Sequence, residues 1–251
     1  MRGVTPRLSA GCGAGGRLRR LLGGQRAWVA TLSVALHIAL VGSTPAQESV
    51  VTPAVSASGK QEQPMRRWMP YGGVHEFGVT GGLSWVSGPV WGYRTQVHYA
   101  PIDLRYSYLM TAHQHFTARY SPEVTALAWL DELVLDESNS VIGRKHTFGG
   151  GFSPLGFQVD FRPLHRVQPF WSNAAGIVYF ANRVLSPEGS QFMYTIDFGG
   201  GINIHIERHR AVTIGYRYQH LSNANISPHN PGTDAGIFYV GFSQFHTHGV
   251  K

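Results

Sequence analysis

The feature that most constrains this chain is a two-residue alternation of apolar and polar side chains. It is clearest in "QFMYTIDFGGGINIHI" (residues 191–206), where one set of alternate positions is apolar and the other is largely polar. Successive side chains of a β-strand point to opposite faces of a sheet, so this period predicts a strand with one apolar face. The segment 129–147 shows no clear period and stays unassigned. The pattern predicts eight strands, over 75–87, 95–110, 114–130, 148–162, 167–182, 191–206, 210–222 and 235–245.

Three features favour a membrane barrel over a soluble exported β-sandwich, whose strands also alternate. The segments are about 10 residues or longer, as tilted strands that cross a bilayer require. Their number is even, and no apolar run of helix length follows residue 46. Aromatic side chains also gather near the segment ends, as in an interfacial belt. The aromatic residues concerned are Trp85, Trp91, Trp129, Trp171, Tyr179 and Phe180. The predicted fold is therefore an all-β, eight-stranded antiparallel transmembrane barrel over residues 71–251.

The first 46 residues have the composition of an export signal. Six arginines precede or border the apolar stretch Trp28–Gly42, and small residues at Thr44 and Ala46 suit cleavage after Ala46. The alternative is a retained membrane anchor, but the stretch is shorter than the roughly 20 residues that span a bilayer. Residues 47–70 mix Ser, Gln, Pro and charge without a period and are predicted to form a flexible leader.

Charge and cysteine content exclude several classes of function. Six of the 21 Lys and Arg and none of the 14 Asp and Glu lie in the predicted signal, so the rest carries 15 against 14, a formal charge of +1. This balance argues against nucleic acid as a partner. The single cysteine, Cys12, lies in the signal, which excludes disulfides from the exported chain. His113, His115, His246 and His248 lie on a strand edge or in the tail, so neither a metal site nor a cofactor is predicted.

A histidine, a serine and an acid share the predicted lipid-facing side of the last two strands. In an outer-membrane barrel the N-terminus and the short turns are periplasmic, so the loop 223–233 would lie at the outer leaflet, where lipopolysaccharide resides. The apolar positions of 210–222 continue in step to His220 and Ser222, and Asp234 is in step with the apolar positions of 235–245. The apolar positions in question are Val212, Ile214, Tyr216 and Tyr218, followed by Phe238, Val240 and Phe242.

These three residue types suit nucleophilic acyl transfer. A serine hydroxyl needs a neighbouring imidazole to take its proton, and a carboxylate must hold that imidazole in the right tautomer. Residues two apart on an ideal strand stand roughly 6.5 Å apart, so the strand is predicted to bend near His220 and Ser222. Amide groups of Asn223, Asn225 or Asn230 are the candidate oxyanion donors, and the sequence does not choose among them.

The stretch "QHLSNANISPHNPGTD" (residues 219–234) resembles the PagL-type lipid A deacylases, which are eight-stranded outer-membrane barrels. The family pattern is a His, one residue, Ser-Asn-Ala, a short loop with an Asn and a Gly, and then an acid. This chain departs from it in two places, because the acid is Asp where the best-known members have Glu, and Asn225 stands where Gly is usual. The resemblance implies His220 as general base, Ser222 as nucleophile and Asp234 as the acid that orients His220.

The resemblance also implies a function. It implies an esterase of the outer membrane that hydrolyses the 3-O-linked acyl chain of lipid A, with lipid A or lipopolysaccharide as substrate and outer-membrane lipids around it. It implies no metal and no cofactor. Two alternatives stay open, namely a non-catalytic structural or adhesive barrel, and an acyltransferase that adds a chain to lipid A. The sequence also leaves a homodimer open.

Overall fold

The computed structural model describes residues 69–86, 90–136, 138 and 140–247. The predicted export signal and residues 47–68 of the predicted leader lie outside them. Over the described ranges, no helix is both long and apolar enough to cross a membrane. The described residues form nine strands: β1 (His75–Val86), β2 (His98–Ala112), β3 (Phe116–Tyr120), β4 (Glu123–Leu135), β5 (Val141–Phe161), β6 (Val167–Val184), β7 (Ser190–Glu207), β8 (Arg210–Ser222) and β9 (Thr233–His246).

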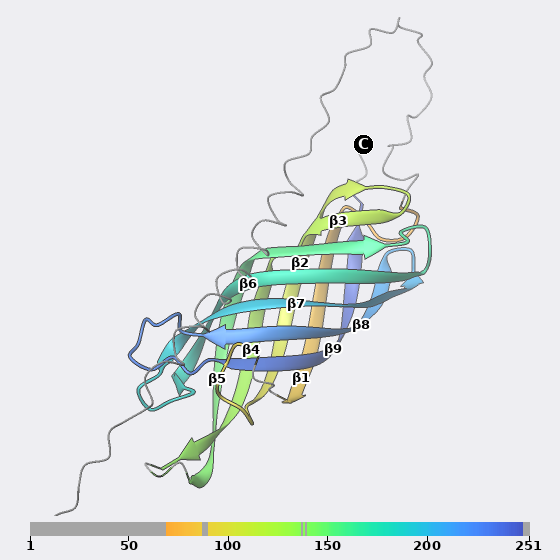
Figure 1. Cartoon of the computed structure of the whole chain (residues 1–251). Helices are drawn as coiled ribbons and strands as arrows, with labels where there is room; N and C mark the ends of the chain where they lie inside the picture. Colours follow the sequence, from red (N-terminus) through yellow and green to blue (C-terminus); the bar gives the residue numbers. More distant parts are fainter. Residues whose placement is uncertain (1–68, 87–89, 137, 139, 248–251) are drawn as a thin grey trace, which may run out of the picture. The chain divides into compact units, whose positions relative to one another are not determined.

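The strands close into a barrel (Figure 1). Every paired neighbour is antiparallel, and β1 pairs with both β2 and β9, which joins the two ends of the sheet. β3 and β4 share one position in the wall, because each pairs with β2 on one side and β5 on the other. The barrel therefore has eight wall positions, and the predicted eight-stranded antiparallel fold is confirmed.

The structure corrects one predicted strand and assigns the segment that the sequence left open. The strand expected over 114–130 is interrupted between β3 and β4, where Pro122 lacks the N–H that a continuous ladder needs. Ser121 there donates its backbone N–H to Gly156 O at 2.7 Å. The unassigned segment 129–147 consists of the ends of β4 and β5, which stay paired as far as Leu135 and Val141. This hairpin projects beyond its neighbours at the lower left of Figure 1.

The connections between strands lie at two ends of the barrel. We call the end that carries the β1–β2, β4–β5, β6–β7 and β8–β9 connections the loop end, and the opposite end, which carries the β2–β3, β5–β6 and β7–β8 connections, the turn end. The antiparallel pairing places the last residues of β8 and the first residues of β9 at the loop end.

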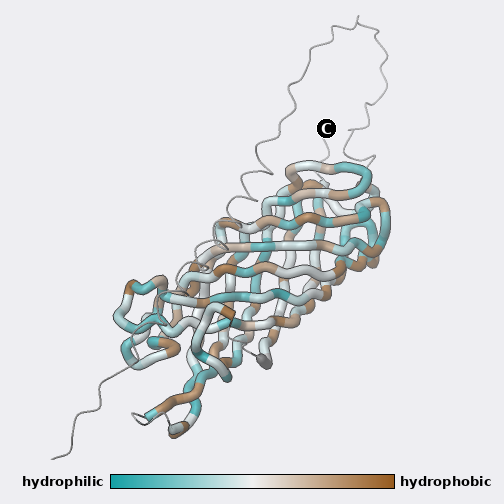
Figure 2. Tube along the Cα trace, viewed as in Figure 1, coloured by the Kyte–Doolittle hydropathy of each residue, from teal (hydrophilic) through white to brown (hydrophobic). Residues whose placement is uncertain are grey.

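The two faces of the wall differ in polarity, as the alternation predicts. Along β8, Ile214 and Tyr216 are 48% and 44% exposed, whereas Thr213 and Arg217 are buried. Figure 2 shows hydrophilic and hydrophobic residues succeeding one another along the strands. Large apolar side chains are likewise exposed on the other strands, including Phe77, Leu104, Phe198, Val240 and Phe242. The outer wall is thus an apolar surface suited to lipid, and the predicted orientation of the alternation is confirmed.

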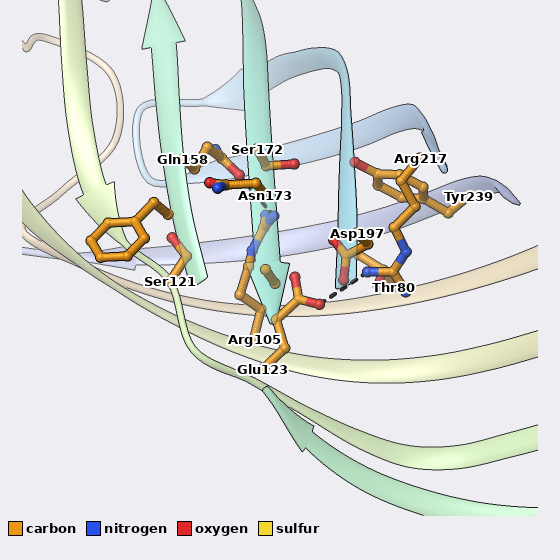
Figure 3. A pocket seen from close by; sticks show the side chains of 12 residues that line it. Thr80, Arg105, Ser121, Glu123, Gln158, Ser172, Asn173, Asp197, Arg217 and Tyr239 are labelled. Carbon is orange, nitrogen blue, oxygen red and sulfur yellow. Dashed lines mark hydrogen bonds and ion pairs between the residues drawn. The ribbon is translucent and has the colours of Figure 1, made fainter. Parts of the chain in front are cut away.

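Side chains from several strands project into the barrel interior, where they line a pocket (Figure 3). Arg105 of β2 donates to Glu76 of β1 at 2.9 Å and to Gln158 of β5 at 2.8 Å. Arg217 of β8 reaches across to Glu123 of β4 at 3.0 Å and also binds Asp103 of β2. Buried charges are tolerated where each has a partner, so these contacts tie distant parts of the wall together. Towards the loop end the interior becomes apolar, with Tyr99, Leu130, Phe180, Leu221 and Ile237 fully buried.

Candidate active site

A histidine and an aspartate form a hydrogen-bonded pair on the outer wall at the loop end. His220 of β8 and Asp234 of β9 are direct cross-strand partners, and His220 Nδ1 lies 2.6 Å from Asp234 Oδ1. The side chain of Asp234 is fully buried and that of His220 is 15% exposed. A histidine whose Nδ1 faces a carboxylate presents Nε2 as a proton acceptor. The pair therefore has the arrangement of a general base and its orienting acid.

Ser222 is the last residue of β8, two positions beyond His220 on the same face of the strand. It is half-buried and pairs with Tyr194 of β7. Among the described residues, no hydrogen bond joins Ser222 to His220. The structure thus brings His220 and Asp234 into contact and leaves Ser222 beside them. A missing hydrogen bond in a structure without substrate does not exclude a catalytic serine, because such bonds often form only when substrate binds.

The predicted bend near His220 and Ser222 is found later in the chain. β8 keeps regular pairing through Leu221 with β9 and through Ser222 with β7. The chain turns immediately afterwards, where Ala224 and Asn225 have φ of +50° and +64°. Asn is enriched among the non-glycine residues that adopt this left-handed region, so Asn225 suits the position that Gly occupies in the family pattern.

The three oxyanion candidates have different surroundings. Asn223 is committed to the loop, because its Nδ2 donates to Ser227 Oγ at 2.6 Å and to His229 O at 2.8 Å, and its N–H donates to Asn230 Oδ1 at 2.9 Å. The N–H of Asn225 is also used, by Asn223 Oδ1 at 2.9 Å. Asn230 Nδ2 donates only to Asn225 Oδ1, at 3.2 Å. Within the described loop, the side-chain amides of Asn225 and Asn230 therefore keep uncommitted donors.

The β1–β2 connection completes the site, and sequence reasoning missed this role. Asp234 Oδ2 accepts backbone N–H groups from Val90 and Trp91, both at 2.7 Å, and from Gly92 at 2.9 Å. The Trp91 ring, predicted only as part of an interfacial belt, also lies edge-on to His220, with centroids 5.7 Å apart at 84°. These partners are 142 to 144 residues from Asp234 along the chain, so no local pattern signals them.

The histidines that the sequence raised as metal ligands lie elsewhere. His113 stacks on Phe116 with centroids 5.1 Å apart, and His246 lies edge-on to Phe77 at 5.8 Å. His248 lies outside the described residues. In the part of the chain that the structure covers, no group of three or more His, Cys, Asp or Glu is arranged to hold a metal ion.

An eight-position antiparallel barrel with an apolar outer wall and a polar, packed interior defines the class of outer-membrane β-barrel proteins. The family model described as lipid A 3-O-deacylase (PagL) matches residues 79–243, which is more than half of the chain. The chain belongs to this family, and its location is the outer membrane. Comparison with the curated proteins found no match to the chain.

Several solved outer-membrane barrels are similar to this chain at low sequence identity. The outer-membrane enzyme PagL is 13% identical, with a TM-score of 0.47 over 67% of this chain and 98% of that one. OprG from Pseudomonas aeruginosa is 13% identical, with a TM-score of 0.45 over 71% and 99%. The neisserial surface protein NspA is 11% identical, with a TM-score of 0.43 over 68% and 97%. At these values the assignment of the fold rests on the strand pairing itself.

Proposed function

We propose that the protein is a lipid A 3-O-deacylase that acts as a serine esterase, with Ser222 as nucleophile, His220 as general base and Asp234 as orienting acid. The observation that carries the proposal is the hydrogen-bonded His220 and Asp234 pair on the outer wall, with Ser222 on the same face of β8. Membership of the family supports lipid A as the substrate class.

The position of the pair supports a substrate that is itself a membrane lipid. Polar groups on the lipid-facing side of a barrel cost free energy unless they are paired, and a functional role explains their presence there. Because the site opens on the outside of the wall, an acyl ester of a neighbouring lipid reaches Ser222 by lateral movement in the leaflet. We place the loop end, and with it the site, on the outer side of the membrane, as is usual for barrels of this class.

The reaction proceeds in two acyl-transfer steps. Ser222 Oγ attacks the ester carbonyl carbon while His220 Nε2 takes its proton, which gives a tetrahedral intermediate. His220 returns the proton to the 3-oxygen of the sugar, the carbon–oxygen bond breaks, and an acyl-Ser222 ester remains. His220 then deprotonates a water molecule that attacks this ester, and the fatty acid leaves as Ser222 regains its proton. The His220 imidazolium is stabilised by Asp234 in both steps.

The intermediate carries a negative charge on the former carbonyl oxygen, which needs hydrogen-bond donors. The side-chain amides of Asn225 and Asn230 keep donors that the loop does not use, whereas both donors of the Asn223 amide are engaged. Of these two, Asn225 is exposed and Asn230 is half-buried. We therefore assign Asn230 as the first oxyanion donor to test and Asn223 as a residue that shapes the loop.

Mass spectrometry of lipid A tests the proposal. Cells that express wild type or Ser140→Ala should lose one ester-linked acyl chain, whereas cells that express Ser222→Ala should keep it. Ser140 is a matched control because it is an exposed serine at the same end of the barrel, in the β4–β5 connection. The same loss with Ser222→Ala would refute the serine mechanism. A gain of mass by one acyl chain would identify an acyltransferase, and unchanged lipid A with folded wild type would favour a non-catalytic barrel.

A further inference from the structure

We propose that residues 90–94 of the β1–β2 connection form a positioning element that holds Asp234 for His220. This inference deepens the proposed function and rests on it, because Asp234 is the orienting acid of the same site. The residues concerned act through Asp234, so they are positioning residues.

The connection binds one carboxylate oxygen and leaves the other to the histidine. Oδ2 accepts three consecutive backbone N–H groups, from residues 90, 91 and 92, and Oδ1 binds His220. Successive N–H groups that converge on one oxygen form an anion-binding concavity, and hydrogen bonds to an ionised acceptor are about twice as strong as neutral ones. The two sets of contacts fix both the position and the plane of the Asp234 carboxylate.

The connection is itself fastened to the hairpin that carries the site. Tyr93 N–H donates to Pro231 O at 2.8 Å, and Arg94 N–H donates to Gly232 O at 3.0 Å. The hydroxyl of Thr233 donates to Arg94 O at 3.0 Å, one residue before Asp234. The N–H groups of residues 90–92 are therefore held in place relative to the start of β9. They are preorganised for the Asp234 carboxylate and do not depend on it for their position.

Trp91 adds a cover over the pair. Its ring lies edge-on to His220, and 5.5 Å from the ring of Tyr218 at 86°. It also lies 6.2 Å from Phe198 on β7, so it spans two strands of the outer wall. Excluding water from a hydrogen-bonded pair strengthens its electrostatic interaction. The connection thus both orients Asp234 and shields its contact with His220.

The element depends on a close approach of two backbones. A Cβ added to Gly92 would lie 2.5 Å from Thr233 Cα, so a side chain at position 92 would force the connection away from β9. Gly143 provides a matched position, because a Cβ added there meets no atom within 4 Å and the residue also lies at the loop end, in the β4–β5 hairpin. The same Gly→Ala change thus disturbs the element at one position and leaves it intact at the other.

The experiment compares full-length wild type, Gly92→Ala and Gly143→Ala in detergent micelles. Three measurements are made: the folded fraction from heat-dependent gel mobility, kcat and KM on lipid A, and the downfield proton resonance of His220 Nδ1–H, assigned by its absence in His220→Ala. We expect Gly92→Ala to fold, to lose roughly 10- to 100-fold in kcat with little change in KM, and to lose or shift the resonance. Gly143→Ala should match wild type in all three.

Each outcome decides the proposal. If Gly92→Ala keeps both the wild-type kcat and the wild-type resonance, the connection does not position Asp234. If Gly92→Ala does not fold, Val90→Pro is used in its place, and Val90→Ala serves as its control. Proline at position 90 removes one of the three N–H donors without adding an atom beside Thr233. An unchanged resonance in Val90→Pro then overturns the proposal. If wild type is inactive, the proposed function fails, and the resonance alone decides whether the connection holds Asp234.

Discussion

Asp234→Asn is the substitution whose effect the geometry defines most sharply. The change keeps the size of the side chain and replaces one oxygen with an NH2 group. Three N–H donors face Oδ2, so the NH2 group cannot turn towards them without losing three hydrogen bonds. Each such loss costs about 1–3 kcal/mol. The amide must therefore keep its oxygen in the β1–β2 connection and point its NH2 group at His220.

This orientation inverts the hydrogen bond to His220. The new side-chain amide at position 234 would donate to Nδ1, which forces the imidazole proton onto Nε2. In the proposed mechanism, Nε2 is the atom that accepts the proton of Ser222. The equivalent change in serine triads lowers kcat about 10⁴-fold because it selects the wrong tautomer. That factor corresponds to roughly 5 kcal/mol of transition-state stabilisation, at about 1.4 kcal/mol for each tenfold. We expect a loss of this order in Asp234→Asn, with the fold retained.

A time course of 3-O-deacylation, followed by mass spectrometry of lipid A in mixed micelles, measures the loss. Asp136→Asn serves as the control, because Asp136 is an exposed aspartate in the β4–β5 connection whose carboxylate binds Ser138 and Ser140. It should keep the wild-type rate. A rate for Asp234→Asn within a few-fold of wild type, in protein with wild-type gel mobility, would refute the assigned role of the pair.

Three further substitutions test other parts of the structure. Arg217→Met should lower the free energy of unfolding by about 3–5 kcal/mol, because it leaves buried carboxylates without their partner. Arg210→Met removes an ion pair that is half exposed, so it should change the free energy of unfolding by at most about 1 kcal/mol. Equal losses in urea unfolding from vesicles would contradict this. Gly232→Ala should reduce kcat without unfolding the barrel, since φ is +58° there and the new Cβ would lie 3.2 Å from His220 Cε1. An unchanged kcat would mean that the His220 ring has room to move. Ile214→Arg should cost about 2–4 kcal/mol in the same unfolding assay if this outward position lies near the bilayer midplane, and a negligible cost would place it outside the hydrocarbon layer.

The barrel wall was predictable because each of its faces meets a different environment. Within the membrane-facing part, alternation separates Ile214 and Tyr216 from Thr213 and Arg217, and the sequence carries that contrast directly. The β4–β5 hairpin projects beyond the other strands, where both faces of a strand can be exposed. Val141 and Ile142 are 59% and 65% exposed although they are neighbours, so this segment shows no alternation to detect.

The candidate site was predictable in part for a similar reason. His220 and Ser222 continue the parity of β8, and Asp234 continues that of β9, so their common face follows from the pattern alone. The direct register of His220 with Asp234 follows from the hairpin only once the loop length is known. The contacts of the β1–β2 connection with Asp234 join residues more than 140 positions apart in the chain, and backbone donors carry no side-chain signature.

The packed interior also has a consequence for the permeability of the membrane. Because Arg105 and Arg217 cross the lumen to carboxylates on other strands, and apolar side chains occupy the loop end, we expect the described barrel to conduct solutes poorly. On that expectation, a cell could increase the amount of this protein in its outer membrane without opening a route for antibiotics or ions. The chemistry proposed for the outer surface would then leave the diffusion barrier of the membrane intact.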